Sequence, residues 1–145
     1  MANESLYQIG VKAVIKNASG KYLIIQSLRH HDNQVYWDLP GGRIEEGETA
    51  ADTLKREVAQ EAGITDLSIE RPLAMALSGV RLPLDDGKQV GLVLDAYACS
   101  TAQGQLKFKD PDNLSGKWCP ASEVAALLRE NQAYPRAIIN AIAAL

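Results

Sequence analysis

The chain has 145 residues, of which 46% are hydrophobic and 23% are charged, and its formal net charge is −3 at pH 7. This length fits one domain with a substantial core, so a second full domain is not expected. The weakly acidic balance argues against a protein that binds the backbone of nucleic-acid polymers, because such proteins usually carry a basic face. If this protein binds phosphate groups, it therefore needs a metal ion to offset their charge.

The N-terminal residues do not resemble a targeting segment. The chain begins MANESLYQIG, which lacks the charged start and the apolar run of a signal peptide. No apolar stretch of the sequence approaches the length of a membrane span. We therefore expect a cytoplasmic protein without a membrane partner, with a short disordered lead over residues 1–5.

The two cysteines, Cys99 and Cys119, indicate thiols rather than a metal site. They do not form a CxxC pair, and neither has a histidine at zinc-ligand spacing. We expect both to be buried free thiols. A Cys99–Cys119 disulfide is the alternative, although nothing else in the sequence points to an oxidising compartment.

The N-terminal part of the chain predicts a hairpin, a polar loop and a short third strand. Residues 7–15 are rich in β-forming residues, 17–20 is a turn cluster and 22–25 is apolar, which together indicate two strands and their connection. Residues 26–36 are polar and predict a loop. Residues 37–40, Trp-Asp-Leu-Pro, predict a short strand that delivers the chain to the glycines that follow.

Several candidate ligands lie in and beside this loop. Adjacent His30 and His31 would point apart in an extended loop and have no evident third ligand, so a solvated loop is favoured over a metal site, with a substrate contact as the alternative. The guanidinium of Arg29 suits phosphate oxygens, which makes it a candidate substrate contact, with an ordinary surface arginine as the alternative. Trp37 and Tyr36 are candidates for stacking on a base, with packing as the alternative.

A glycine-opened loop and an acidic helix follow. Thr49 with Asp52 three residues later predicts a capping box at the start of the helix, and Gly63 predicts its end. Four residues at helical spacing form the predicted apolar face of this helix: Ala51, Leu54, Val58 and Ala62. That face is expected to enter the core.

The same helix carries two acids that are neighbours on its surface, Glu57 and Glu61. Like charges at this spacing repel each other, and a divalent cation between them would reverse the sign of that interaction. Ahead of the helix, Gly41 and Gly42 allow the backbone to turn a carbonyl or an N–H group toward a ligand. The loop and helix therefore form a candidate site for magnesium and phosphate. The alternative is an amphipathic helix with a solvated acidic face.

The second half of the chain predicts a long hairpin and C-terminal helices. Four stretches have the composition of strands: 67–77, 80–84, 90–99 and 102–111. The sequence Asp-Asp-Gly-Lys over 85–88 is a strong turn signal, so we expect a hairpin there with its second strand central in the sheet. Pro72 indicates an edge strand or the start of a strand. From Pro120 onward apolar residues recur at helical spacing, and Tyr134-Pro135 divides this region into two helices.

The spacing of the residues from the glycine loop to the end of the acidic helix resembles the box that defines the Nudix (MutT-type) hydrolases. Eight of its nine fixed positions match: Gly42, Glu48, Arg56, Glu57, Val58, Glu61, Gly63 and Ile64. The ninth position holds Gln60, where the family normally has a glutamate. The motif is long and its spacing is fixed, which makes it much more specific than a short glycine pattern.

The resemblance implies a metal site of defined composition. Glu57 and Glu61 would ligate magnesium, with manganese as an alternative, and Gly41 would offer its backbone carbonyl. Gln60 would offer an uncharged oxygen, so we expect reduced metal affinity. In Nudix proteins an acidic residue ahead of a tryptophan-led strand often completes the set, and Asp112 resembles that residue here. Asp110 is a second candidate for that position, with a simple Asp-Pro-Asp turn as the alternative.

The elements predict one domain over residues 1–145 of the α+β or α/β class. The resemblance implies a Nudix-like α/β/α sandwich with a mixed sheet, a box helix after a glycine loop, and C-terminal helices. It also implies that Glu48 and Arg56 fix the loop against the helix and belong, with Glu57 and Glu61, to the catalytic set. Gly42, Arg29 and Trp37 are the candidate substrate contacts.

The function implied is magnesium-dependent hydrolysis of a nucleoside diphosphate linked to a group X, by water attack at phosphorus. The partner would be a small nucleotide, and the protein a monomer or a homodimer. A nucleotide-binding or regulatory module with little turnover is the alternative, because of Gln60. An isomerase on the same scaffold is less favoured, since no extra cysteine and glutamate pair suits a proton relay. Residues 79–82 lack the family's subgroup signatures, so the substrate is not indicated.

Overall fold

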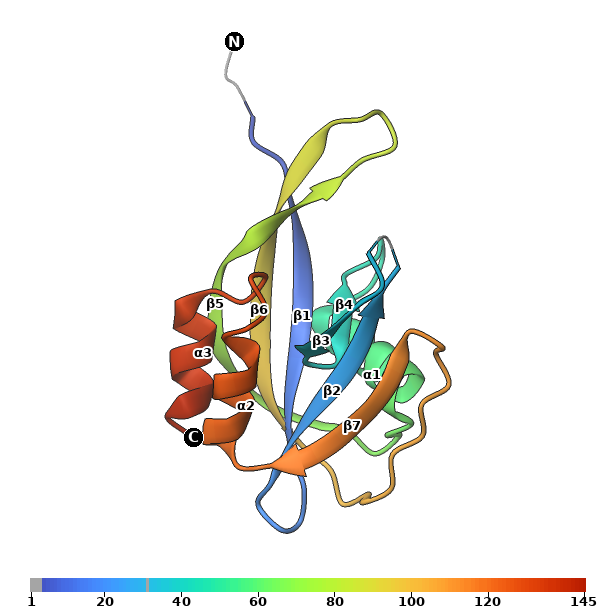
Figure 1. Ribbon diagram of the computed structural model, residues 1–145, viewed down its shortest axis with the longest axis vertical. Helices are drawn as coiled ribbons and strands as arrows, with labels where there is room; N and C mark the ends of the chain where they lie inside the picture. The colour runs from blue at the N-terminus through green and yellow to red at the C-terminus, as the bar shows by residue number, and fades with distance from the viewer. Residues whose placement is uncertain (1–3, 31) are drawn as a thin grey trace.

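In the computed structural model, which describes residues 4–30 and 32–145, the centre of the sheet is β1 (Tyr7–Lys16). It pairs in parallel with β6 (Gln89–Ser100) along its whole length. On its other side it meets β2 (Tyr22–Arg29) at the predicted hairpin and pairs antiparallel with β4 (Gly41–Arg43). The described residues form a seven-stranded mixed sheet, which confirms the predicted sheet type (Figure 1).

The strand β2 is paired on both sides, with β3 (Gln34–Asp38) and with β7 (Asn113–Cys119). The predicted loop over residues 26–36 is therefore wrong at both of its ends. Its polar residues belong to half-exposed strands, where a polar side chain faces outward while the backbone stays in the ladder. Among the connecting residues, His31 lies outside the described residues, as do residues 1–3 of the predicted disordered lead.

The predicted hairpin is confirmed, but its first strand is longer than predicted, because the stretches 67–77 and 80–84 form one strand, β5 (Ser68–Pro83), paired with β6. β5 lies at the edge of the sheet, which is one of the two interpretations of Pro72. Figure 1 shows the turn end of this hairpin projecting beyond the helices. The predicted strand over residues 102–111 is wrong. Lys107 donates its backbone N–H to the carbonyl of Ala62 at 2.8 Å, and the amide of Gln103 donates to the carbonyl of Gly63 at 2.8 Å. This segment therefore caps the end of a helix instead of joining the sheet.

Helices cover both faces of the sheet (Figure 1). On one face α1 (Ala50–Ala62) packs on a core of buried side chains that includes Val11 and Ile15. On the other face α2 (Ala121–Leu128) and α3 (Arg136–Ala143) pack on a second buried cluster. The α/β/α sandwich is therefore confirmed. None of the described helices is both long and apolar enough to cross a membrane.

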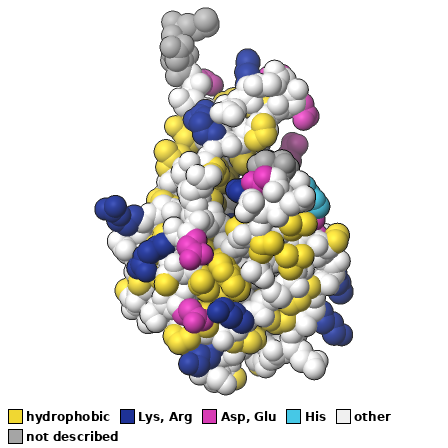
Figure 2. Space-filling model, in the orientation of Figure 1, with side chains coloured by type: hydrophobic (Ala, Val, Ile, Leu, Met, Phe, Trp, Pro, Cys, Tyr) yellow, Lys and Arg dark blue, Asp and Glu magenta, His cyan; other side chains and the backbone are white. Residues whose placement is uncertain are grey.

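The outer surface carries mixed charges. On the face shown in Figure 2, the described basic side chains are interspersed with acidic and apolar ones. This distribution agrees with the net charge of −3 for the chain. A continuous basic stripe of the kind that follows a nucleic-acid backbone is not seen among the described residues of this face.

The two cysteines are buried and free, as predicted. Cys99 belongs to the core on the α1 side of the sheet, and Cys119 belongs to the core on the other side. Burial raises the pKa of the Cys99 thiol to about 12 and that of the Cys119 thiol to about 11. Both thiols are therefore protonated and unreactive at neutral pH.

The start of α1 is the predicted capping box. The hydroxyl of Thr49 accepts from the N–H of Asp52 at 3.1 Å, and the carboxylate of Asp52 accepts from the N–H of Thr49 at 3.1 Å. The predicted apolar face needs one correction, because Ala51 is exposed and Thr53 is fully buried. The hydroxyl of Thr53 donates to Glu48, at 3.0 Å, which satisfies its polar group inside the protein.

Gly63 ends α1 in the left-handed region, with φ of 72°. A Cβ atom at this position would lie 2.7 Å from the Cβ of Lys107, so the site combines backbone strain with a steric clash. Gly87 is a matched control, because its φ is 82° and nothing lies within 4 Å of its added Cβ.

We expect Gly87→Ala to lower the free energy of unfolding by about 1 kcal/mol, the cost of a left-handed conformation. Gly63→Ala should lower it by at least about 1 kcal/mol more, because overpacking adds to that cost. Urea unfolding of both variants measures the difference. Equal losses in the two variants would show that the segment around Lys107 moves away freely.

Candidate metal and nucleotide site

The loop before α1 is fixed to the helix by one arginine. Nε and Nη2 of Arg56 each donate to a different oxygen of Glu48, both at 2.8 Å. Thr53 and the backbone N–H of Glu45 also donate to this carboxylate. The hydrogen bonds from Arg56 are the main reason why the pKa of Glu48 is lowered to about 2. Glu48 is therefore ionised at any physiological pH and acts as a fixed acceptor.

The same arginine also holds Glu57. Its Nη1 donates to Oε1 of Glu57 at 2.7 Å, so the guanidinium joins the loop acid to the helix acid. The backbone of Gly42 passes directly against this carboxylate. A Cβ atom at Gly42 would lie 2.7 Å from both Cδ and Oε1 of Glu57. Position 42 therefore has to be glycine for the loop to approach Glu57 this closely.

Glu61 lies one turn further along α1, where its carboxylate is largely buried. The N–H of Gly41 points to its Oε2 at 3.4 Å. Burial is the largest cause that raises the pKa of Glu61, to about 9, and a hydrogen bond with Glu57 adds to it. The negative charges of Glu57 and Asp38 act in the same direction, and only Lys12 opposes them. Glu61 is therefore protonated at neutral pH in the absence of a cation.

The Glu57–Glu61 pair fits a hard divalent cation, because a cation can take the place of the proton on Glu61 and attract both carboxylates. In the described part of the chain, no three His, Cys, Asp or Glu side chains are grouped closely enough to hold a metal by themselves. That composition suits magnesium, which is usually held by one or two carboxylates while waters and substrate phosphates complete its shell.

Glu61 opens into a small cavity of ≈250 Å³. Its lining brings together the glycine loop, α1 and the segment before β7: Ser27, Leu28, Tyr36, Asp38, Gly41, Glu61, Asp110, Asp112 and Asn113. Both candidates for the downstream acid are therefore at the same cavity as Glu61. Asp110 accepts from the N–H of Asp112 at 2.9 Å, and the carboxylate of Asp112 contacts the ring of His30. Sequence reasoning missed this partner of His30, which is 82 residues away.

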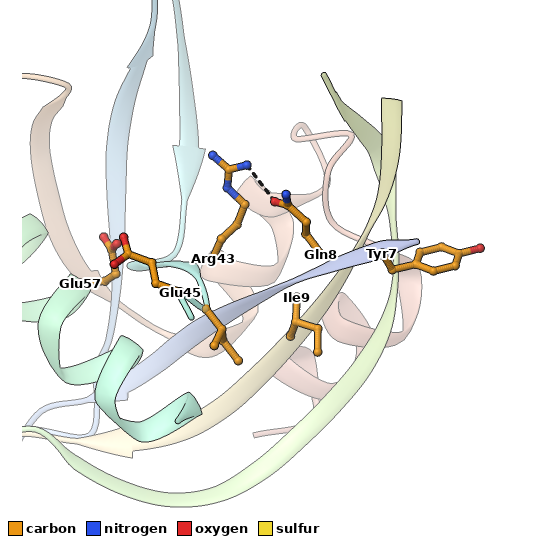
Figure 3. Close-up of a pocket in the computed structure, with 7 residues that line it drawn as sticks. Tyr7, Gln8, Ile9, Arg43, Glu45 and Glu57 are labelled. Atoms are coloured by element: carbon orange, nitrogen blue, oxygen red, sulfur yellow. Dashed lines mark hydrogen bonds between the residues drawn. The ribbon is translucent and has the colours of Figure 1, made fainter. Parts of the chain in front are cut away.

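Glu57 faces a different hollow of ≈600 Å³ (Figure 3). Glu45 and Glu57 lie at one end of it, while Tyr7 points away from them (Figure 3). Arg43 crosses the space between and donates to the side-chain oxygen of Gln8 at 2.9 Å. The two acids of the pair therefore line separate hollows, and the pair itself lies between them.

Three of the expected site residues lie elsewhere or in a different setting. Gln60 is exposed and lines neither of these hollows. The ring of Trp37 lies against Nζ of Lys117, 5.1 Å from the ring centroid, and packs on the core under α2. Its position therefore gives no support to a substrate contact. Arg29 is paired with Asp32 and lies 5.8 Å from the ring centroid of Tyr36.

Arg29 and Tyr36 belong to a larger cavity of ≈760 Å³ on the α3 side of the sheet. Leu82, Leu92 and Leu94 provide apolar lining, and the connection between α2 and α3 closes one side. Further lining residues are Lys12, Gln34, Val35, Asp38, Val80, Arg81, Glu130, Asn131, Gln132, Ala133 and Tyr134. Tyr36 and Asp38 also line the ≈250 Å³ cavity of Glu61, so the two cavities adjoin.

A buried polar cluster that the sequence did not indicate lies where these cavities meet. Lys12 binds the carboxylate of Asp38, and the hydroxyl of Tyr134 donates to the same carboxylate. The N–H of Leu39 donates to the hydroxyl of Tyr134 at 3.1 Å. Burial alone would lower the pKa of Lys12, but the carboxylates of Asp38 and Glu61 outweigh it and raise that pKa. Lys12 is therefore a charged group inside the protein.

Sequence comparison identifies relatives for most of the chain. Residues 6–140 match the family model described as NUDIX domain. A putative mutator protein MutT4 of Mycobacterium tuberculosis is 34% identical over 98 residues, which cover 66% of this chain and 37% of that protein. An 8-oxo-dGDP phosphatase of Mus musculus is 31% identical over 124 residues, which cover 82% of this chain and 34% of that protein. The matched stretches thus span little more than a third of these relatives.

Solved structures show the same fold at low identity. A MutT protein from Methanosarcina mazei superimposes with a TM-score of 0.69 at 20% identity, over 97% of this chain and 94% of that one. A C. elegans Ap4A hydrolase superimposes with a TM-score of 0.68 at 16% identity, over 93% of this chain and 92% of that one. At these identities the likeness concerns the architecture.

The raised pKa of Glu61 predicts a pH dependence of stability. The folded carboxyl keeps its proton up to a pKa of about 9, whereas the ordinary value is 4.5. The contribution of Glu61 to stability is therefore full below pH 4.5 and is lost as the pH rises toward 9. In buffer with a metal chelator, Tm of wild type should fall relative to Tm of Glu61→Gln across this range.

Asp85→Asn is the matched control, because Asp85 is an exposed turn residue. Its melting curve should follow that of wild type at every pH. Parallel curves for wild type and Glu61→Gln would contradict the assignment of a buried, protonated carboxyl to Glu61.

Proposed function

The chain belongs to the Nudix family, and we propose that it hydrolyses a phosphoanhydride bond in a nucleoside diphosphate linked to a further group X. The products would be a nucleoside monophosphate and X-phosphate. The observation that carries this proposal is the carboxylate pair of Glu57 and Glu61, held between two hollows against a glycine loop. Such a pair is suited to a metal ion and to phosphate chemistry.

The metal we propose is magnesium, with manganese as the alternative. Glu57, Glu61 and the backbone carbonyl of Gly41 would hold it. When bound, such an ion neutralises phosphate charge and lowers the pKa of coordinated water. Asp112 and Asp110 lie at the same cavity as Glu61, which supports a role for one of them beside the substrate phosphates.

Glu57 is the group we propose as general base. Arg56 orients its carboxylate through a hydrogen bond of 2.7 Å from Nη1. Glu57 would take a proton from the attacking water as the water oxygen bonds to phosphorus. The phosphoanhydride P–O bond then breaks, and the leaving phosphate departs with the bonding electron pair. Glu48 contributes by holding Arg56 through two hydrogen bonds.

The adjoining cavities suggest how a substrate lies. Its phosphates would occupy the ≈250 Å³ cavity beside Glu61, and its nucleoside would extend past Tyr36 and Asp38 into the ≈760 Å³ cavity. A relative from Haemophilus influenzae is named 8-oxo-dGTP diphosphatase and is 37% identical over 57 residues, which cover 39% of this chain and 42% of that protein. Nucleoside triphosphates, oxidised purines included, are therefore the first substrates to test.

A nucleotide-binding module with little turnover is the second candidate, because Gln60 lacks the charge that the family normally has at this position. The exposure of Gln60 argues for turnover, since the missing charge lies outside both hollows that Glu57 and Glu61 line. The two candidates differ in one measurable respect, the release of phosphate or pyrophosphate.

The test is a panel of nucleoside triphosphates, nucleotide sugars and dinucleoside polyphosphates, incubated with the purified chain and magnesium. We expect phosphate or pyrophosphate release from at least one class. Glu57→Gln and Glu61→Gln should each reduce kcat by roughly a hundredfold or more, the scale of a lost general base or metal ligand. Glu46→Gln, a change at an exposed acid of the same loop, should leave kcat unaffected. An undiminished kcat in either Glu57→Gln or Glu61→Gln would contradict the role assigned to that residue.

Gln60→Glu tests the departure from the family pattern. An exposed carboxylate near the site attracts a cation only through solvent, so the magnesium concentration for half-maximal rate should fall about two- to fivefold. Added salt should abolish this gain, because it screens exposed charges. A gain above about tenfold that survives high salt would instead make position 60 a direct metal ligand.

A further inference from the structure

Lys12 is a buried cation in the central strand of the sheet. Its side chain is 14% exposed, and its Nζ lies 3.2 Å from Oδ1 of Asp38 and 3.3 Å from the carbonyl oxygen of Leu39. Replacing a buried ion pair by apolar residues of similar size is often neutral or stabilising. Lys12 and Asp38 both lie on the wall of a cavity that Leu92 and Leu94 also line. Stability therefore gives only a weak reason for an ion pair at this place, and its position at the cavity points to a role there.

The ammonium group of Lys12 has a donor to spare. It carries three N–H bonds and no acceptor. The two carboxylate oxygens of Asp38 lie 3.2 and 3.4 Å from Nζ. Seen from Nζ, they are much closer together in direction than two N–H bonds of an ammonium group are. Both oxygens therefore share one N–H donor. The carbonyl of Leu39 takes the second. The ring of Tyr134 also lies near Nζ, with its centroid 6.0 Å away. Among the described residues, Nζ has no hydrogen-bond acceptor besides Asp38 and Leu39, and Lys12 lines the ≈760 Å³ cavity.

The position of Lys12 relative to Glu57 and Glu61 determines which part of a bound nucleotide can reach its spare donor. Asp38, the partner of Lys12, lines both the large cavity and the small cavity of Glu61. A nucleotide with its phosphates at Glu61 therefore has to pass Asp38 to place its base in the large cavity. The charge of Lys12 is already balanced by Asp38, so its spare donor suits a neutral acceptor more than a further anion.

We infer that Lys12 is a specificity-determining residue that donates a hydrogen bond to an exocyclic carbonyl oxygen of the substrate base. Guanine, hypoxanthine, thymine and uracil carry such an oxygen where adenine and cytosine carry an amino group. A buried ammonium can only donate, so an amino group at the same place would leave two donors facing each other. The substrate class is then a nucleotide with a keto base. This inference rests on the proposed function, because that function places the phosphates at Glu61.

Two pairs of nucleoside triphosphates test this hydrogen bond. ITP and ATP differ in the exocyclic oxygen or amino group of the purine, and UTP and CTP differ in the same way at the pyrimidine. Wild type should favour the keto member by about tenfold in kcat/KM in at least one pair. In Lys12→Met that ratio should fall close to one. Lys12→Arg, which keeps the donors, should retain a preference, and Lys16→Met, at an exposed lysine of the same strand, should leave the ratio unchanged.

Binding measurements separate this inference from the proposed function. Calorimetry with IMP against AMP, and with UMP against CMP, reports base preference even where no turnover occurs. If Lys12→Met fails to fold, as judged by circular dichroism, Lys12→Gln keeps a donor for Asp38 and should still lower the ratio. Equal use and equal binding of both members of each pair by wild type would overturn the inference. So would a folded Lys12 variant, Met or Gln, that slows both members by the same factor.

Discussion

The guanidinium of Arg56 is the group on which the rest of the site depends. It reaches across from α1 to Glu48 in the loop with two hydrogen bonds and to Glu57 with a third. A planar group with several fixed donors can hold two carboxylates in one geometry, which an ammonium on a flexible stem cannot do equally well. The path of the loop follows from this, since Gly42 has to pass against Glu57 without a side chain.

The environments of Glu57 and Glu61 differ although the residues are four apart on one helix. Arg56 forms an ion pair with Glu57, whereas Glu61 is buried, which raises its pKa to about 9. Two acids with opposed environments are a common arrangement in enzymes that transfer protons near neutral pH. The surroundings of Glu57 are set by the loop on one side of α1, and those of Glu61 are set by the sheet and Asp38 on the other side.

Local signals carried most of the correct predictions. The capping box at Thr49 and the turn before β6 depend on neighbours in the chain, and both were read from the sequence. Contacts over long separations were not accessible: Lys12 meets Asp38 across 26 residues, and Tyr134 meets Asp38 across 96. The predicted apolar face of α1 wrongly included Ala51 and did not include Thr53, which is buried because its hydroxyl donates to Glu48. No hydrophobic pattern encodes that bond.

The alternation of side chains along β1 has a consequence for how such a protein can diversify. Val11, Ala13 and Ile15 face the core under α1, whereas Lys12 lies at the cavity on the opposite side. Phosphate chemistry and base recognition, as proposed, thus depend on different faces of one strand. On the inferred role of Lys12, a mutation at position 12 changes which nucleotide is selected while the packing beneath α1 stays as it is. One fold can in this way acquire new substrates through single substitutions, while the residues that act on the phosphates stay unchanged.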